Sequence, residues 1–235
     1  MITRKLTGNN YLAWTYDGVT SSTLGEAATA NSNVMYSGDA TSTGDIDASD
    51  ILVADDIWKM QEAARMGYIG SAQKRKMHPI RTAGGDKYIY VAHPFEIANL
   101  KHSAGSVWED YQKYANVRGP DNPLFVGTRN LAGQLPTPIG ELYGVLIYEY
   151  HALPTYTTWG VGGNVAGCEG LFLGAEAGIF AHCREPEYVD EGGMYKEYMG
   201  VGTRALYGFD KATFNSIDNG VILHRSAGKI HYTNS

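Results

Sequence analysis

The segment from Met194 to Phe214, MYKEYMGVGTRALYGFDKATF, strings apolar and aromatic residues together with glycines over an unusually long stretch. Gly200, Gly202 and Gly208 each disfavour a helix by about 1 kcal/mol, so the pattern favours extended β structure. Fully extended, the segment would reach roughly 70 Å, whereas a compact chain of this size is only about 45 Å across. The pattern predicts an elongated ribbon or, as an open alternative, two ordinary strands broken at Gly200 or Gly208.

A helical pattern begins at Asp50. Apolar residues fall on one broad helical stripe, made of Ile51, Leu52, Ile57, Trp58, Met60, Ala63, Ala64 and Met66. We expect Ser49 or Asp50 to cap this helix and Gly67 to end it.

The other elements follow from shorter patterns. We expect a strand at residues 88–92, followed by a short helix that opens at Pro94 and by a helix over 106–117. A strand is expected over 142–150, and a strand, a tight helical turn and a second strand over 170–183. The last expected strand covers 220–224. Residues 1–48 are polar and read as irregular, and residues 118–140 are rich in Pro and Gly and read as one long loop. Loops of that length are usually functional or interactive. The acidic run of Glu185, Glu187, Asp190 and Glu191 could bind a cation, but it favours a solvated turn.

Composition favours a folded mixture of α and β structure over a helical bundle. The 235 residues include 29 Gly and 17 Tyr, and 43% of them are hydrophobic, which is enough for a hydrophobic core.

The net charge of −6 disfavours a general nucleic-acid clamp. Charge is nevertheless segregated, because residues 1–60 are acidic while residues 65–87 carry Arg65, Lys74, Arg75, Lys76, Arg81 and Lys87 against Asp86 alone. Such blocks are usually solvated faces, but subunit contacts also use them.

The chain has only two cysteines, Cys168 and Cys183, and no apolar run follows MITRKLTGNN as it would in a signal peptide. Both features favour a reducing compartment. No stretch approaches the ~18 apolar residues of a membrane span.

No catalytic or metal motif emerges from the spacing. His151, Cys168, His182 and Cys183 have no metal-ligand spacing, and a thiol within an apolar strand is usually a packed core residue. The sequence contains no G-x-S-x-G elbow, and Gly200-Val201-Gly202 lacks the third Gly of a dinucleotide loop. We therefore expect no enzyme activity, no cofactor and no metal.

Seven segments, taken in order, resemble the podophage-type major capsid proteins of tailed phages, whose fold is that of the Hong Kong 97 capsid protein. They are HPIRTAGGDKYIYVAHPFEIANLKH (78–102), Trp108 with its helix, RGPDNPLFVGT (118–128), YGVLIYEY (143–150), LFLGAEAGIFAHC (171–183), KEYMGVGTRALYGFDKATFN (196–215) and DNGVILHRSAG (218–228). The resemblance covers roughly residues 47–228.

The resemblance implies an α+β capsid fold with an axial domain and part of a peripheral domain. It divides the chain into an irregular segment at 1–46, an axial-type domain at 47–190 and peripheral-type long strands at 191–235, including the strand at 221–224. An N-terminal arm, an extended loop and a long spine helix precede the matched region in this family. No such helix can be read in residues 1–46, so the sequence looks like a shortened product or a fragment.

By the same resemblance, the function is that of a structural virion protein. It would self-assemble through hexamers and pentamers into an icosahedral head around double-stranded DNA in the bacterial cytoplasm, with scaffold or decoration proteins as further candidate partners and no membrane. The expected subunit-interface residues are Tyr111, Tyr114, Arg118, Asp121, Tyr198, Arg204 and Tyr207. The alternative is a soluble enzyme or carbohydrate-binding module that holds a small ligand in aromatic, Gly-rich loops such as residues 159–164.

Overall fold

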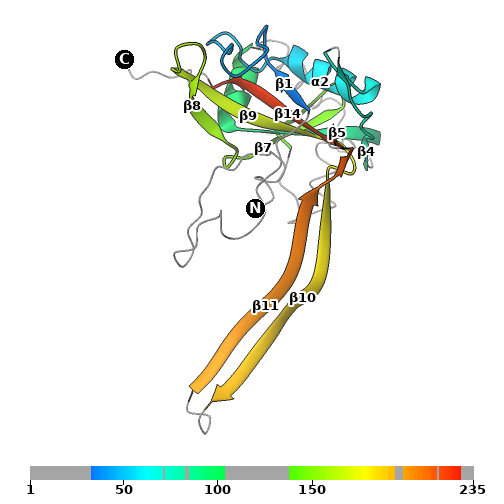
Figure 1. Cartoon of the computed structure of the whole chain (residues 1–235), viewed down its shortest axis with the longest axis vertical. Helices are drawn as coiled ribbons and strands as arrows, with labels where there is room; N and C mark the ends of the chain where they lie inside the picture. The colour runs from blue at the N-terminus through cyan, green and yellow to red at the C-terminus, as the bar shows by residue number, and fades with distance from the viewer. Residues whose placement is uncertain are drawn as a thin grey trace, which may run out of the picture.

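A long two-stranded hairpin projects from a body of strands and helices in the computed structural model (Figure 1). The structure describes residues 33–70, 72–82, 85–103, 138–193, 198–215 and 217–228.

The body is built on one mixed sheet. Its central path runs through β1 (Val34–Tyr36), β14 (Val221–Ala227), β9 (Val165–Leu173), β5 (Gly85–Ala92), β7 (Val145–Glu149) and β6 (Gly140–Leu142). Two further strands lie off this path, since β4 (Ile80–Thr82) pairs with β5 and β8 (Thr155–Trp159) pairs with β9. The β1/β14 and β5/β7 pairs are parallel and the others are antiparallel.

Helix α2 (Ala54–Met66) forms where the apolar stripe predicts it. It ends at Gly67, whose φ of 77° is the left-handed conformation that glycine adopts without strain, and whose N–H donates to Ala63 O at 2.8 Å. The predicted cap at Ser49 or Asp50 is wrong. The cap position is Val53, and its N–H donates to the Asp56 carboxylate at 3.2 Å, which holds the first turn from within the helix.

Both described helices cover the same face of the sheet. Tyr90, Phe172 and Ile222 share that face because they are register partners on β5, β9 and β14. They pack with Met60 of α2 and with Leu100 of a second helix at residues 94–103. The opposite face carries a smaller cluster of Leu153, Leu171, Val221 and Leu223.

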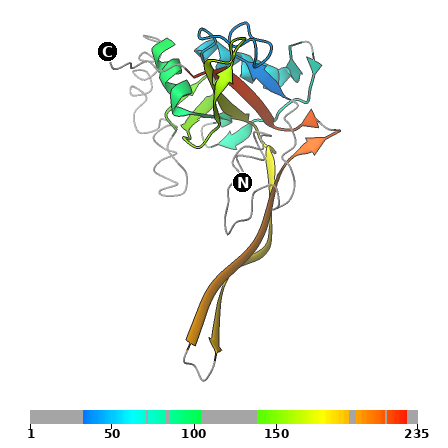
Figure 2. The ribbon, with the colours of Figure 1, turned by 60° about the vertical axis from the view of Figure 1, so that its left-hand side comes forward.

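The hairpin pairs β10 (Gly178–Gly193) with β11 (Tyr198–Lys211) in an antiparallel ribbon (Figure 2). At about 3.3 Å per residue, the 14 residues of β11 span about 45 Å, which matches the diameter of a compact protein of this size. Two small pairs complete the described elements: β12 (Thr213–Phe214) with β13 (Ile217–Asp218), and β2 (Tyr68–Ile69) with β3 (Ala72–Gln73).

The elongated reading of the ribbon is therefore confirmed, because β11 runs unbroken through Gly200, Gly202 and Gly208. The strands at 88–92 and 220–224 and the helix opening at Pro94 are confirmed as well. The predicted strand over 142–150 is interrupted by a turn at Tyr143 and Gly144, and the predicted helical turn between β9 and β10 is a plain turn.

One further expectation is wrong, two strands were not foreseen, and one predicted helix is untested. The acidic run 185–191 is no turn but part of β10. β1 and β8 were not predicted, because β1 (VMY) has only three residues and β8 (TYTTW) consists mostly of threonine. The helix expected at 106–117 lies outside the described residues.

The domain division stays a prediction. The boundary after residue 190 falls within β10, and β14 lies between β1 and β9 in the sheet of the body.

Candidate functional site

The base of the hairpin is fixed to the body by buried contacts. Phe209, near the end of β11, packs on the cluster of Leu153, Leu171, Val221 and Leu223. The Lys211 Nζ lies 2.8 Å from the Asp218 carboxylate, and these side chains are only 3% and 2% exposed. The Asn33 side-chain amide also donates to the Asp218 backbone carbonyl at 3.0 Å. The direction of the hairpin is thus set by a buried ion pair and an apolar contact.

Beyond its base, the hairpin exposes large apolar side chains. Phe180 stacks on Tyr207 with ring centroids 5.7 Å apart and meets the His182 ring edge-on at 4.6 Å. We call Phe180, His182 and Tyr207 the aromatic cluster of the hairpin. Phe180 and Tyr207 remain 49% and 58% exposed, and Ile179, Tyr188 and Leu206 are exposed too. Exposed apolar side chains gathered on one projection typically mark a surface that another protein covers.

The interface residues expected from the sequence fall in two groups. Tyr198, Arg204 and Tyr207 lie on β11, where Tyr198 pairs in register with Gly193, and Arg204 forms an ion pair with Glu187 of β10. Tyr111, Tyr114, Arg118 and Asp121 lie outside the described residues. The interface role of all seven remains a prediction.

The sequence analysis missed the contribution of β10. Phe180 and Tyr188 were not singled out, although Phe180 completes the aromatic cluster. Cys183 was expected in a packed core but is exposed on β10, whereas Cys168 is buried in the body, where burial raises the pKa of its thiol well above the ordinary range. The sequence did contain a signal for β10: two long segments, 178–193 and 198–211, follow each other closely, and each can form a strand that pairs with the other.

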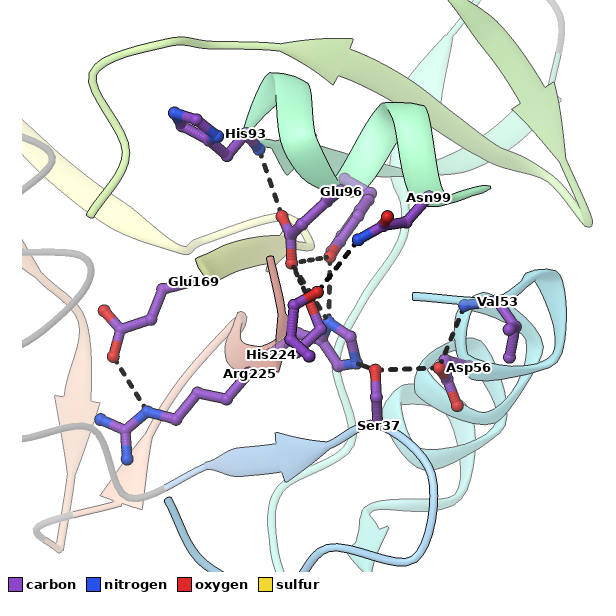
Figure 3. Close-up of polar contacts among 12 residues, drawn as sticks. Ser37, Val53, Asp56, His93, Glu96, Asn99, Glu169, His224 and Arg225 are labelled. Carbon is purple, nitrogen blue, oxygen red and sulfur yellow. Dashed lines mark hydrogen bonds and ion pairs between the residues drawn. The ribbon is translucent and has the colours of Figure 1, made fainter. Parts of the chain in front are cut away.

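A second constellation lies inside the body, between the sheet and the helices (Figure 3). His224 of β14 is at its centre: its Nε2 lies 3.1 Å from Ser37 Oγ, and its Nδ1 lies 3.0 Å from the Tyr90 hydroxyl and 3.7 Å from Glu96. The Ser37 hydroxyl donates to Asp56 at 3.0 Å, and the Ser226 hydroxyl donates to Glu96 at 2.8 Å. These six residues form the buried polar network.

A serine, an imidazole and a carboxylate in this order resemble a nucleophile, a base and an orienting group. Ser37, Glu96 and His224 are however at most 1% exposed, so no substrate reaches the hydroxyl. Burial, reinforced by the Glu96 carboxylate, raises the pKa of Tyr90 well above its ordinary value, so its phenol stays protonated. The network joins the end of β1, α2, β5, the helix at 94–103 and β14, and its geometry suits structural cohesion.

The close packing around this network explains why residue 170 is a glycine. A Cβ at Gly170 of β9 would lie 2.2 Å from the Tyr90 hydroxyl and 2.9 Å from Glu96. Any side chain there would push the tyrosine or the carboxylate out of place.

The loop at residues 159–164, which the alternative function uses to hold a ligand, does not expose its aromatic residue to solvent. Trp159 is 7% exposed and stacks on Tyr156 with ring centroids 4.7 Å apart. Its ring is therefore unavailable to a sugar or another small ligand.

Within the described residues, no three His, Cys, Asp or Glu side chains gather as a metal site requires. The helices of that same part of the chain include none with the length and apolar character needed to cross a bilayer.

Comparison with known proteins ties this architecture to a family. No protein family model matches the sequence. The chain is 30% identical over 155 residues to the major capsid protein of Pseudomonas phage KPP25, across 62% of this chain and 38% of that protein. Its structure matches the capsid of Ralstonia phage GP4 with a TM-score of 0.75 and 22% identity, covering 99% of this chain and 63% of that chain. This chain has the fold of phage capsid proteins and is similar in sequence to a phage major capsid protein.

A third match supports the same fold. The cyanophage Pam1 capsid aligns with a TM-score of 0.57 and 17% identity over 79% of this chain and 49% of that chain. The expected resemblance and the α+β class are confirmed. The chain spans less than half the length of the Pseudomonas phage protein, so the activity and partners of a complete capsid protein come to it only as proposals.

Proposed function

We propose that this chain is a structural subunit of a phage head, which associates with copies of itself into an icosahedral shell built of hexamers and pentamers. The observation that carries this proposal is the capsid fold, matched over 99% of the chain in the Ralstonia phage GP4 capsid. The sequence relationship to a major capsid protein supports it independently.

The physical logic of the hairpin agrees with such a role. An isolated two-stranded ribbon is at best marginally stable in water, because it cannot bury one of its faces. Here the ribbon carries the exposed aromatic cluster next to its base, where Phe180 pairs in register with Phe209, and continues beyond it away from the body (Figures 1 and 2). In a shell, a neighbouring subunit would cover these side chains, and each contact between standard-size partners would bury about 1,600 Å². Tyr198, Arg204 and Tyr207 would then be interface residues.

A mechanical rather than a catalytic role follows from the same proposal. Among the described residues, the arrangement around Ser37 and His224 resembles catalytic machinery, but it is buried inside the body. We assign its hydrogen bonds to cohesion of the subunit, which a shell under internal pressure from packed DNA requires.

The shell would enclose double-stranded DNA without reading its sequence, inside a virion assembled in the bacterial cytoplasm. The basic block at 65–87 supplies candidate contacts to the phosphate backbone, of which Lys76 and Arg81 are exposed. Scaffold and decoration proteins remain candidate partners.

Negative-stain microscopy and sedimentation velocity of the purified chain over a concentration series test this function. We expect sedimentation to shift with concentration and micrographs to show repeating assemblies, because identical subunits associate by mass action. A lone particle at every concentration would contradict the proposal.

A further inference from the structure

The two long edges of the hairpin differ in their ability to accept another strand. The β10 edge is irregular, with register shifts between His182 and Arg184 and between Arg184 and Glu187. Pro186, which has no N–H to donate, lies within the second irregular stretch, and Arg184 and Glu185 are exposed beside it. Bulges, proline and charge are the devices by which natural proteins prevent strands from adding to an edge.

The β11 edge has none of these devices over residues 202–209. The extra residues of both register shifts lie in β10, so β11 runs regularly along its partner. A Cβ placed on Gly202 or Gly208 would meet nothing within 4 Å, so the faces of the ribbon are open at these two positions. Arg204 is the charged residue of this stretch, and Glu187 already neutralises it. Among the described residues, β11 pairs with β10 alone.

We propose that the outer edge of β11 pairs with β11 of a second copy, antiparallel and about a twofold axis, so that two hairpins form one four-stranded sheet. The inference rests on the proposed self-association and names the strand through which it occurs. Strand addition supplies backbone hydrogen bonds to an edge that otherwise keeps them only with water.

The regularity of the edge selects the same strand as the partner. Arg204 is the charged residue of β11 over 202–209, and it already forms an ion pair with Glu187 of its own hairpin. Two β10 edges would instead have to pair through Pro186 and the irregular stretch between His182 and Glu187, which interrupts a regular ladder. The hairpin stands clear of the body along most of its length, so a second copy can reach the edge (Figures 1 and 2).

A cysteine scan tests this pairing. In the Cys183→Ser background, residues Thr203, Arg204, Ala205, Leu206 and Tyr207 are replaced one at a time by Cys, and each variant is oxidised mildly and resolved on a non-reducing gel. Around a twofold axis a residue meets its own copy at one position only, where opposed Cβ atoms lie about 5 Å apart. We expect one position to cross-link at least severalfold faster than the positions on both sides of it.

The native chain provides the matched control, because its Cys183 is an exposed thiol on β10 while Cys168 is buried in every variant. We expect Cys183 to cross-link more slowly than the peak position of β11. A flat profile along β11, or fastest cross-linking through Cys183, overturns the edge pairing. If the unmodified chain still associates in sedimentation, that result leaves the proposed function standing, whereas a chain that stays monomeric overturns both.

Discussion

At the scale of single residues, His93 shows how a side chain fixes a helix end. Its Nδ1 accepts a hydrogen bond from the Phe95 N–H at 3.2 Å, and its own backbone N–H donates to Glu96 at 3.2 Å. Only an imidazole without a proton on Nδ1 accepts that bond. Burial lowers the pKa of His93 below its ordinary value, in agreement with the geometry.

This arrangement predicts an acid-sensitive helix cap. A histidine with a lowered pKa in the folded state contributes stability that is present above its unfolded pKa of about 6.5 and is lost as pH falls through the folded pKa. The variant His93→Asn keeps a capping acceptor but does not titrate. We expect its unfolding free energy to decline less between pH 7 and pH 5 than that of the native chain, by about 1 kcal/mol, which is the usual contribution of a cap. Urea unfolding of both proteins measures it, and identical declines would contradict the assignment.

At the scale of elements, the buried Lys211–Asp218 pair joins the end of β11 to β13 and so fixes the base of the hairpin. Replacing Lys211 by Met leaves the Asp218 carboxylate buried without its cation. We expect a loss of about 3–5 kcal/mol in unfolding free energy, most of which the double variant Lys211→Met/Asp218→Leu should restore.

An exposed pair supplies the control for this prediction. Lys59 and Asp55 lie 2.7 Å apart on α2 with half-exposed side chains. Asp55→Asn should cost at most about 0.5 kcal/mol, because an exposed ion pair contributes little and Lys59, which also lies 3.8 Å from the buried Asp56, stays in place. Equal losses at both sites in chemical denaturation would show that the Lys211 pair is no anchor.

At the scale of the whole molecule, the body and the hairpin are separable in their packing. Among the side chains that the structure describes between residues 183 and 206, none belongs to a hydrophobic cluster, whereas Phe209 does. We therefore expect the outer hairpin to contribute little to the core of the body.

A shortened hairpin tests this separation. Deleting residues 183–206 and joining His182 to Tyr207 through an Asn-Gly turn retains their native pairing and the buried base. We expect the melting midpoint to move by only a few degrees while concentration-dependent sedimentation disappears. Loss of cooperative melting in circular dichroism would place the outer hairpin in the folding core instead.

Much of this architecture could be predicted because local signals were strong. The apolar stripe of α2 and the Gly67 stop mark that helix, and β5 and β14 carry runs of β-forming residues. The acidic stretch of β10 could not be placed, since a strand exposed on both faces lacks the alternation that distinguishes strand from turn. The short β1 belongs to the sheet only because β14 pairs with it from 189 residues further along, as the register of Met35 with His224 shows. The contact of Ser37 with His224 joins the same two segments.

The amino-acid sequence by itself determined the family resemblance, the extended character of the segment at 194–214 and the absence of known catalytic motifs, because the order of motifs, local composition and residue spacing can be read before the chain folds. Only the tertiary structure decided that β11 pairs with β10 in a projecting hairpin, that β14 lies within the body, and that Ser37, Glu96 and His224 meet out of reach of solvent. Those outcomes depend on contacts between distant segments, and burial and register are properties of the folded chain alone.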